Sequence, residues 1–337
     1  MGTIDIGAGT LALTSSGNIS QTGTITADTL GILNYGGTTV LAQNNRVDTL
    51  EVNHNILNNN NSIEFTNNQG LNVSMINQGS GGAAVTLTAA GNLTFSGDVN
   101  TYGGDLSVTT TGGGSITQNG GTTITTGTGA TTLDSAGDIT LNGANVMGDL
   151  TVTGTTVQIT ENDAITDAAA WSISDALTLN DVSASGGIIL NNGIADLTSL
   201  TAATNGSLSI AGSGSPTLTA LNLTLDPSTG GTQTYALSGF GGGLALALTD
   251  SGGDLQLGTS SFPNAVSIEN SGGGFTFAPS STISWGGAST AVLTADSDID
   301  LNNGTFINGS ILSLLIGQGA AGGTLNTTGG VVSGIGT

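Results

Sequence analysis

Apolar residues along this chain come in pairs two positions apart, and each pair is followed by a short turn sequence. Leu71 and Val73 form one such pair, Leu93 and Phe95 form another, and the turns between pairs consist of Gly, Asn, Ser and Thr. Alternation with a period of two places both apolar side chains on the same face of a strand. The pattern therefore predicts many short strands, each with one buried face.

A longer repeat overlies this alternation. A four-residue signature of Gly, then Asn, Asp or Ser, then an aliphatic residue, then Thr or Ser begins at Gly91, Gly114 and Gly137, at equal intervals. It also begins at Gly17, Gly104, Gly148 and Gly206. A fixed period of roughly 20–25 residues with two or three short strands is typical of a solenoid.

The two periods together predict an all-β, right-handed parallel β-helix with roughly 20–23 residues per coil. In this fold each coil lays its strands on those of the preceding coil, so aliphatic side chains stack in columns inside. We expect Leu93, Ile116 and Ile139 to occupy equivalent inward positions. The threonines that follow them, Thr94, Thr117 and Thr140, should face outward.

No shift in composition marks a domain boundary, so we expect a single continuous β-helix over residues 1–337. The least regular stretches are 53–61, which predicts a loop or an asparagine ladder, and 163–171, which predicts a short helical turn or a lateral loop. Neither end shows the amphipathic helix that often caps a solenoid. We therefore expect a fragment of a longer chain, or a filament protomer whose ends are covered by neighbouring copies.

The charge of the chain excludes several partners. There are 23 acidic residues against a single base, Arg46, which gives a net charge of −22. A nucleic-acid backbone must be neutralised by Lys and Arg, so we expect no nucleic-acid partner. The longest apolar run near an end, 311–316, is too short for a bilayer, so we expect no membrane insertion. The absence of Cys suits a protein that is exported unfolded through an oxidising compartment.

Several segments resemble the interior repeats of filamentous haemagglutinin-like exoproteins. The resemblance rests on residues 17–27 with Leu30, on residues 41–50 and on residues 137–141. Proteins of this family are giant adhesins of the two-partner secretion type. The resemblance implies a β-helical rod that is secreted or displayed on the bacterial cell surface, and it transfers no active-site residue. The secretion domain and the effector domain of the family have no counterpart in this sequence.

An enzymatic function is an alternative because some parallel β-helices cleave polysaccharides. Such a site requires two carboxylates at a defined separation, together with a base, a nucleophile and an orienting group. The candidate acids are scattered along the chain: Glu51, Glu64, Glu161, Asp163, Asp167 and Glu269. The pattern predicts no catalytic residue, no cofactor-binding residue and no enzyme, and it favours solvated surface positions for Glu161 and Asp163.

Two small constellations of polar residues are candidates for binding sites. Arg46 and His54 lie near Asp48 and Glu51, which predicts either a small recognition spot or a surface ion pair of little energetic value. The acids Asp296, Asp298 and Asp300 are candidates for weak surface Ca²⁺ binding, but their spacing does not match an EF-hand loop. Of the large aromatic residues, Trp171 is expected in the core, whereas a surface cluster of aromatic side chains would indicate a glycan site.

The sequence thus favours an extracellular structural or adhesive rod, with a glycan or protein of a host or neighbouring cell as a partner. The alternative is a self-assembling filament whose subunits stack end to end, because an exposed coil edge is a template for another strand. A β-helical enzyme acting on glycans is the third alternative.

Overall fold

The computed structural model is built of parallel strands that stack into a β-solenoid, which confirms the predicted fold class. It describes residues 1–54, 61–184, 186–204 and 206–212. Beyond residue 212 it describes the strands, with side chains only at 274–276, 292–295 and 298–300. None of the described residues lies in a helix, and they include no helix long and apolar enough to cross a membrane.

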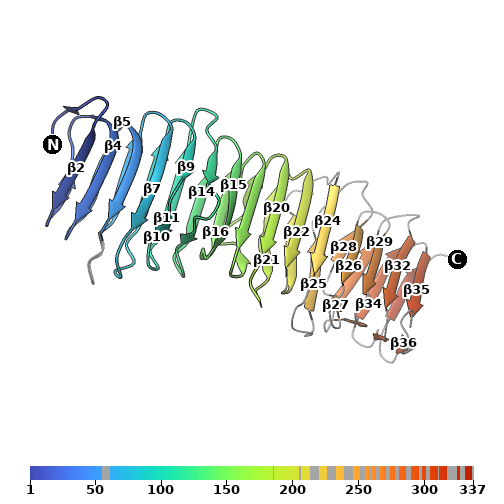
Figure 1. Cartoon of the computed structure of the whole chain (residues 1–337). Coiled ribbons are helices and arrows are strands. Elements are labelled where there is room, and N and C mark those ends of the chain that lie inside the picture. The colour runs from blue at the N-terminus through green and yellow to red at the C-terminus, as the bar shows by residue number, and fades with distance from the viewer. Residues whose placement is uncertain are drawn as a thin grey trace. The chain divides into compact units, whose positions relative to one another are not determined.

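The chain divides into two compact units, Met1–Glu161 and Asn162–Thr337. Figure 1 shows the strands of each unit side by side, in the order of the chain. The strands of the first unit are β1 (Ile4–Asp5), β2 (Thr10–Ser15), β3 (Ile19–Ser20), β4 (Ile25–Asn34), β5 (Thr39–Asn53), β6 (Ile63–Asn67), β7 (Leu71–Asn77), β8 (Val85–Ala89), β9 (Leu93–Phe95), β10 (Val99–Asn100), β11 (Leu106–Thr110), β12 (Ile116–Gln118), β13 (Ile124–Thr125), β14 (Thr131–Asp134), β15 (Ile139–Asn145), β16 (Leu150–Gly154) and β17 (Val157–Glu161).

The strands of the first unit form two main faces. The face that we call sheet A runs through β2, β4, β5, β7, β9, β12, β15 and β17. The face that we call sheet B runs through β3, β5, β6, β8, β11, β14 and β16. Strand β5 contributes to both faces because it continues around a corner at a register shift between Leu41 and Asn45.

The predicted stacking of the signature is confirmed. Leu93 pairs with Ile116 and Ile116 pairs with Ile139, each one repeat further on, and all three side chains are fully buried. The threonines beside them are partly exposed, and the Oγ1 atoms of Thr94 and Thr117 are 3.0 Å apart. Coil length varies more than predicted, since the coil that leads from β15 to β17 is shorter than this repeat and the coil that leads from β11 to β14 is longer.

The glycine of the signature is required by the close approach of successive coils. A Cβ added to Gly114 would overlap the backbone carbonyl of Gly91, and a Cβ added to Gly148 would overlap that of Gly129. At these corners the backbones lie closer together than two side-chain-bearing residues allow. Glycine at this place is therefore a packing requirement.

The small polar residue after the glycine links one coil to the next. The Asn92 side chain accepts a hydrogen bond from the Ser115 N–H, and the Ser115 hydroxyl accepts one from the Asp138 N–H. Asp138 in turn accepts one from the Thr156 N–H, at 3.1 Å. The ladder supplies acceptors to backbone donors at the turns, which would otherwise depend on water.

Buried polar side chains close the interior side of the corners. The Thr101 hydroxyl donates to the Gly104 carbonyl at 2.5 Å, and the Thr126 hydroxyl donates to the Gly129 carbonyl at 3.0 Å. Thr110 does the same for Gly114 at the opposite corner. An inward hydroxyl shortly before a turn carbonyl therefore satisfies a group that the sheet ladder leaves unpaired.

Two larger amide networks occur, which we call the first and second polar clamps. In the first clamp Asn45 is held by Gln21 and accepts a hydrogen bond from the Ile25 N–H at 2.8 Å. In the second clamp Asn145 is held by Gln118 and accepts one from the Ile124 N–H, also at 2.8 Å. The same device thus recurs at a distant point of the first unit.

Glu161 completes the second clamp, and this position corrects a prediction from the sequence. In the first clamp Asn67 is the partner of Asn45 on the next coil, and its side chain accepts a hydrogen bond from the Val47 N–H. In the second clamp Glu161 is the partner of Asn145 on the next coil, and its Oε2 atom accepts a hydrogen bond from the Met147 N–H at 3.2 Å. The predicted solvated position of Glu161 is wrong, because its side chain is fully buried. It occupies an inward position that is filled by an asparagine in the first clamp.

The second unit is also built of parallel strands. They are β18 (Ile165–Thr166), β19 (Trp171–Ile173), β20 (Ala176–Asp181), β21 (Ile188–Ala195), β22 (Ser199–Thr204), β23 (Leu208–Gly212), β24 (Ala220–Leu225), β25 (Gln233–Ser238), β26 (Leu246–Asp250), β27 (Leu255–Leu257), β28 (Ser260–Phe262), β29 (Val266–Asn270), β30 (Phe275–Phe277), β31 (Ser281–Trp285), β32 (Thr290–Ala295), β33 (Ile299–Asp300), β34 (Gly304–Gly309), β35 (Ile311–Ile316), β36 (Leu325–Asn326) and β37 (Val331–Ile335). Strands β28, β31, β34 and β37 form a separate parallel sheet.

The start of the second unit differs from the helical turn or lateral loop predicted for residues 163–171. This stretch contains the short strand β18 and the beginning of β19, joined by bends. Trp171 pairs with Ile194 and is buried, as expected for a core residue. Of the irregular stretch 53–61, residues 55–60 lie outside the described part of the chain.

Candidate functional site

The described acids among those considered for catalysis lie in different environments. Glu51 points outward from sheet A, Glu64 points outward from sheet B, and Glu161 is buried in the second clamp. Asp163 is exposed, and the Asp167 carboxylate accepts the N–H groups of Asn191 and Asn192. The side chain of Glu269 lies outside the described residues.

Of the metal-binding candidates, Asp298 and Asp300 lie on the outward side of one short segment. Asp298 is exposed, Asp300 is partly exposed, and Ile299 between them is buried in the column of Phe275. Asp296 lies outside the described residues. Across the described part of the chain, no three residues of the types His, Cys, Asp or Glu are grouped so as to hold a metal ion.

Arg46 and His54 do not share a surface, as the predicted recognition spot near Asp48 and Glu51 would require. Arg46 is exposed on β5, whereas His54 is fully buried at the corner that follows β5. The His54 Nδ1 atom hydrogen-bonds to the Gln78 Oε1 atom at 3.1 Å. Burial lowers the pKa of His54 below its ordinary value of 6.5, and the hydrogen bonds to Gln78 and to the Asn61 backbone oppose this shift. The imidazole is therefore a neutral core group near pH 7.

Rows of outward polar groups, all but one of them hydroxyls, cover sheet B from β8 to β16. One column consists of Thr86, Ser107, Thr132 and Thr151, and the next consists of Thr88, Thr109, Asp134 and Thr153. Within the described residues none of these side chains hydrogen-bonds to another protein group, in contrast to the bonded pair Thr94 and Thr117 on sheet A. The face therefore presents a regular array of hydroxyls whose hydrogen-bonding capacity is open to solvent or to a ligand.

A shallow groove of about 360 Å³ lies on the outer face of sheet A across β2, β4 and β5. It exists because Ala12 and Gly31 are partners in adjacent strands and their small size leaves a depression. Its lining combines the apolar Leu33 with the polar Glu51 and Asn53. The remaining lining residues are Thr10, Leu13, Thr14 and Ile32.

Two tyrosines lie at the corner that connects sheet A to sheet B. Tyr35 follows Asn34, and Tyr102 follows Thr101. Asn34 and Thr101 occupy the same inward column, with Thr101 three coils further along the chain. Tyr35 is 44% exposed and Tyr102 is 47% exposed. The sequence pattern does not single out this pair, and only the coil register shows that both tyrosines belong to one corner.

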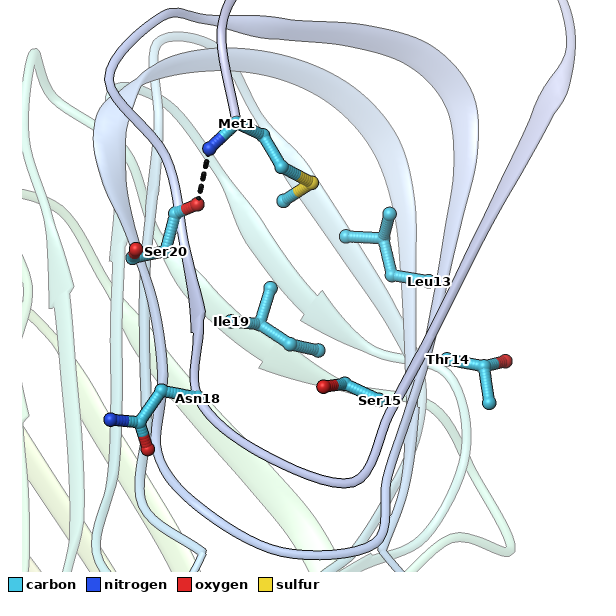
Figure 2. Close-up of a pocket in the computed structure, with 7 residues that line it drawn as sticks. All are labelled: Met1, Leu13, Thr14, Ser15, Asn18, Ile19 and Ser20. Atoms are coloured by element: carbon cyan, nitrogen blue, oxygen red, sulfur yellow. Dashed lines mark hydrogen bonds between the residues drawn. The ribbon is translucent and has the colours of Figure 1, made fainter.

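The first coil presents an open edge. Leu11 and Leu13 of β2 are partly exposed, although their partners on β4 are buried. Figure 2 shows the Leu13 and Ile19 side chains pointing into the coil, with Met1 above them. The Met1 amino group donates to the Ser20 carbonyl at 2.7 Å. The first residues thus cover one side of the coil and leave the β2 edge accessible.

The comparison with known families gives a match over part of the chain. A model described as repeats of unknown function (DUF5649) matches residues 81–149 and 242–312. The first segment spans β8 to β15 and contains two residues of the second clamp, Gln118 and Asn145. No curated protein and no solved structure matches the chain. The chain is therefore similar, over one segment of each unit, to a repeat family whose function is unknown.

Proposed function

We propose that this chain is part of an extracellular adhesive rod, in which stacked coils form a stiff scaffold and display binding surfaces. The single observation that carries the proposal is the continuous parallel stacking of the first unit, where Leu71, Leu93, Ile116, Ile139 and Val157 form one buried column. A scaffold of this kind gains surface with every coil and needs no separate core. The resemblance to exoprotein repeats, the net charge of −22 and the lack of Cys support export and display on a bacterial surface.

Adhesion can be tested with the purified chain. Beads that carry the chain are expected to attach to cell surfaces, and free chain in solution should compete with this attachment. Beads coated with an unrelated acidic protein of similar charge serve as the control, since charge alone would act equally in both. Attachment no stronger than that of the control beads would contradict the adhesive role.

A second proposal is end-to-end association, and the open β2 edge favours it. The side of β2 that faces away from β4 offers backbone donors and acceptors beside the partly exposed Leu11 and Leu13. A strand from a longer polypeptide or from another copy could pair there. Light scattering over a range of protein concentrations tests pairing with another copy. A mass that grows with concentration is expected if copies associate, and a constant monomer mass would contradict association between copies.

A further inference from the structure

Tyr102 holds a backbone conformation that its side chain disfavours. Its φ angle is 52°, in the left-handed region, and its ring is 47% exposed. At the equivalent corners one coil earlier and one coil later the same conformation is taken by glycines, Gly79 and Gly127, with φ angles of 72° and 60°. A bulky side chain in this region is uncommon, and an exposed ring adds nothing to the core that would offset the strain.

Tyr35 places a second ring on the same corner. Three strand spacings separate the two residues, so their backbones are about 14 Å apart along the stacking direction. Tyrosine offers a rigid apolar ring with a polar tip and loses little conformational entropy when it is contacted. Two rings in line along a corner match an extended ligand that runs parallel to the stacking axis.

The surroundings of this corner define the chemistry of that ligand. On one side lies the groove with Leu33 and Glu51, and on the other lies the hydroxyl face that includes Ser107. These groups suit a ligand that is rich in hydroxyls and has apolar ring faces. Asp98 and Asp105 flank Tyr102 in the sequence, and the whole chain holds only one Lys or Arg, so an acidic ligand would be repelled.

We propose that Tyr35 and Tyr102 are binding residues for an extended polysaccharide without acidic groups. The proposal rests on the adhesive function proposed above and names the ligand class of that function. The rings stack on sugar faces, while the hydroxyls of sheet B and the carboxylate of Glu51 hydrogen-bond to sugar hydroxyls.

The test uses the full chain with three soluble probes: a cello-oligosaccharide, a chito-oligosaccharide and polygalacturonate. Binding to at least one of the first two is expected in calorimetry, and no binding to polygalacturonate. The variant Tyr102→Gly should weaken binding at least tenfold without a lower melting temperature, since glycine fits this backbone conformation better than tyrosine. Tyr35→Ala should weaken binding similarly, and Tyr102→Phe should retain it.

The matched control is Ile189→Ala, because Ile189 is 39% exposed on β21 of the second unit, whereas both tyrosines belong to the first unit. This variant should bind as the unchanged chain does. Equal affinity of Tyr102→Gly and the unchanged chain, or binding of polygalacturonate, would overturn the proposal. Attachment of coated beads to cells in the absence of any binding to the two neutral or basic probes would overturn the ligand class while leaving the adhesive function in place.

Discussion

The Asn145 Oδ1 atom accepts a hydrogen bond from the backbone N–H of Ile124 at 2.8 Å, inside the coil and out of contact with solvent. Ile124 belongs to the preceding coil, so the bond holds two coils in register from within. Gln118 fixes the amide of Asn145 by a reciprocal pair of hydrogen bonds. Removal of the acceptor would leave the Ile124 N–H buried without a hydrogen bond, which lowers the stability of the folded state.

Replacement of Asn145 by Ala should therefore destabilise the chain by about 2–4 kcal/mol, since it leaves the Ile124 N–H without an acceptor and removes two of the four hydrogen bonds of the Gln118 side chain. The measurement is the free energy of unfolding in urea. Asn142→Ala is the control, because Asn142 is exposed on the same strand. If both variants lose the same small amount, the second clamp does not stabilise the fold.

Replacement of Gly114 by Ala should cost about 3 kcal/mol or more, because the new methyl group meets the Gly91 carbonyl and the coils must separate. Gly120 has open space around its Cα atom, so Gly120→Ala should change stability by less than about 0.5 kcal/mol. Thermal unfolding of the two variants distinguishes them. A Gly114→Ala variant as stable as Gly120→Ala would contradict the close packing of these corners.

Truncation of Leu150 to Ala should cost about 2–5 kcal/mol, because Leu150 is buried in the column of sheet B. Asp163 is exposed, so Asp163→Ala should change stability by less than about 0.5 kcal/mol. Denaturant unfolding of both variants tests the assignment of inward and outward positions, which comparable losses would refute.

The stability of the chain should depend on the protonation of His54. The folded pKa lies below the unfolded value of 6.5, so unfolding takes up a proton between these two values. The contribution of neutral His54 is complete above about pH 6.5 and is lost as the pH falls below that value toward the folded pKa. The His54→Gln variant should lose less unfolding free energy between about pH 7.5 and pH 5.5 than the unchanged chain. An identical loss in both proteins would show that His54 does not carry this dependence.

The sequence predicts the buried columns because their signal is purely periodic. Alternation with a period of two, together with the regular return of the glycine signature, is enough to place Leu93, Ile116 and Ile139 inside. The prediction for Glu161 is wrong because it follows the usual solvation of acidic residues and not the alternation. Glu161 stands two positions after the buried Ile159, so the alternation itself places its side chain inward. The similar spacing of Phe65 and Asn67 is the signal that points to the correct assignment.

The candidate binding corner could not be found from the sequence. Tyr35 and Tyr102 stand far apart along the chain, and coils of unequal length hide their common column. The left-handed conformation of Tyr102 is also invisible in the sequence, since the glycines of the neighbouring corners stand at unequal distances. Only the strand register shows both features.

The stacking of coils can be measured directly because the chain contains no native Cys. Thr94 and Thr117 are direct partners on neighbouring coils, and the strand spacing of about 4.7–4.9 Å lies within the range of Cα separations that a disulfide can bridge. The double variant Thr94→Cys with Thr117→Cys should therefore form an intramolecular disulfide under mild oxidation, detected by mass spectrometry of proteolytic fragments. The control, Thr94→Cys with Thr140→Cys, spans two coils and about twice the strand spacing of 4.7–4.9 Å, so it should remain reduced. A disulfide in the first pair only is the predicted result, and reduced thiols in the first pair, or equal cross-linking of both pairs, would contradict the solenoid register.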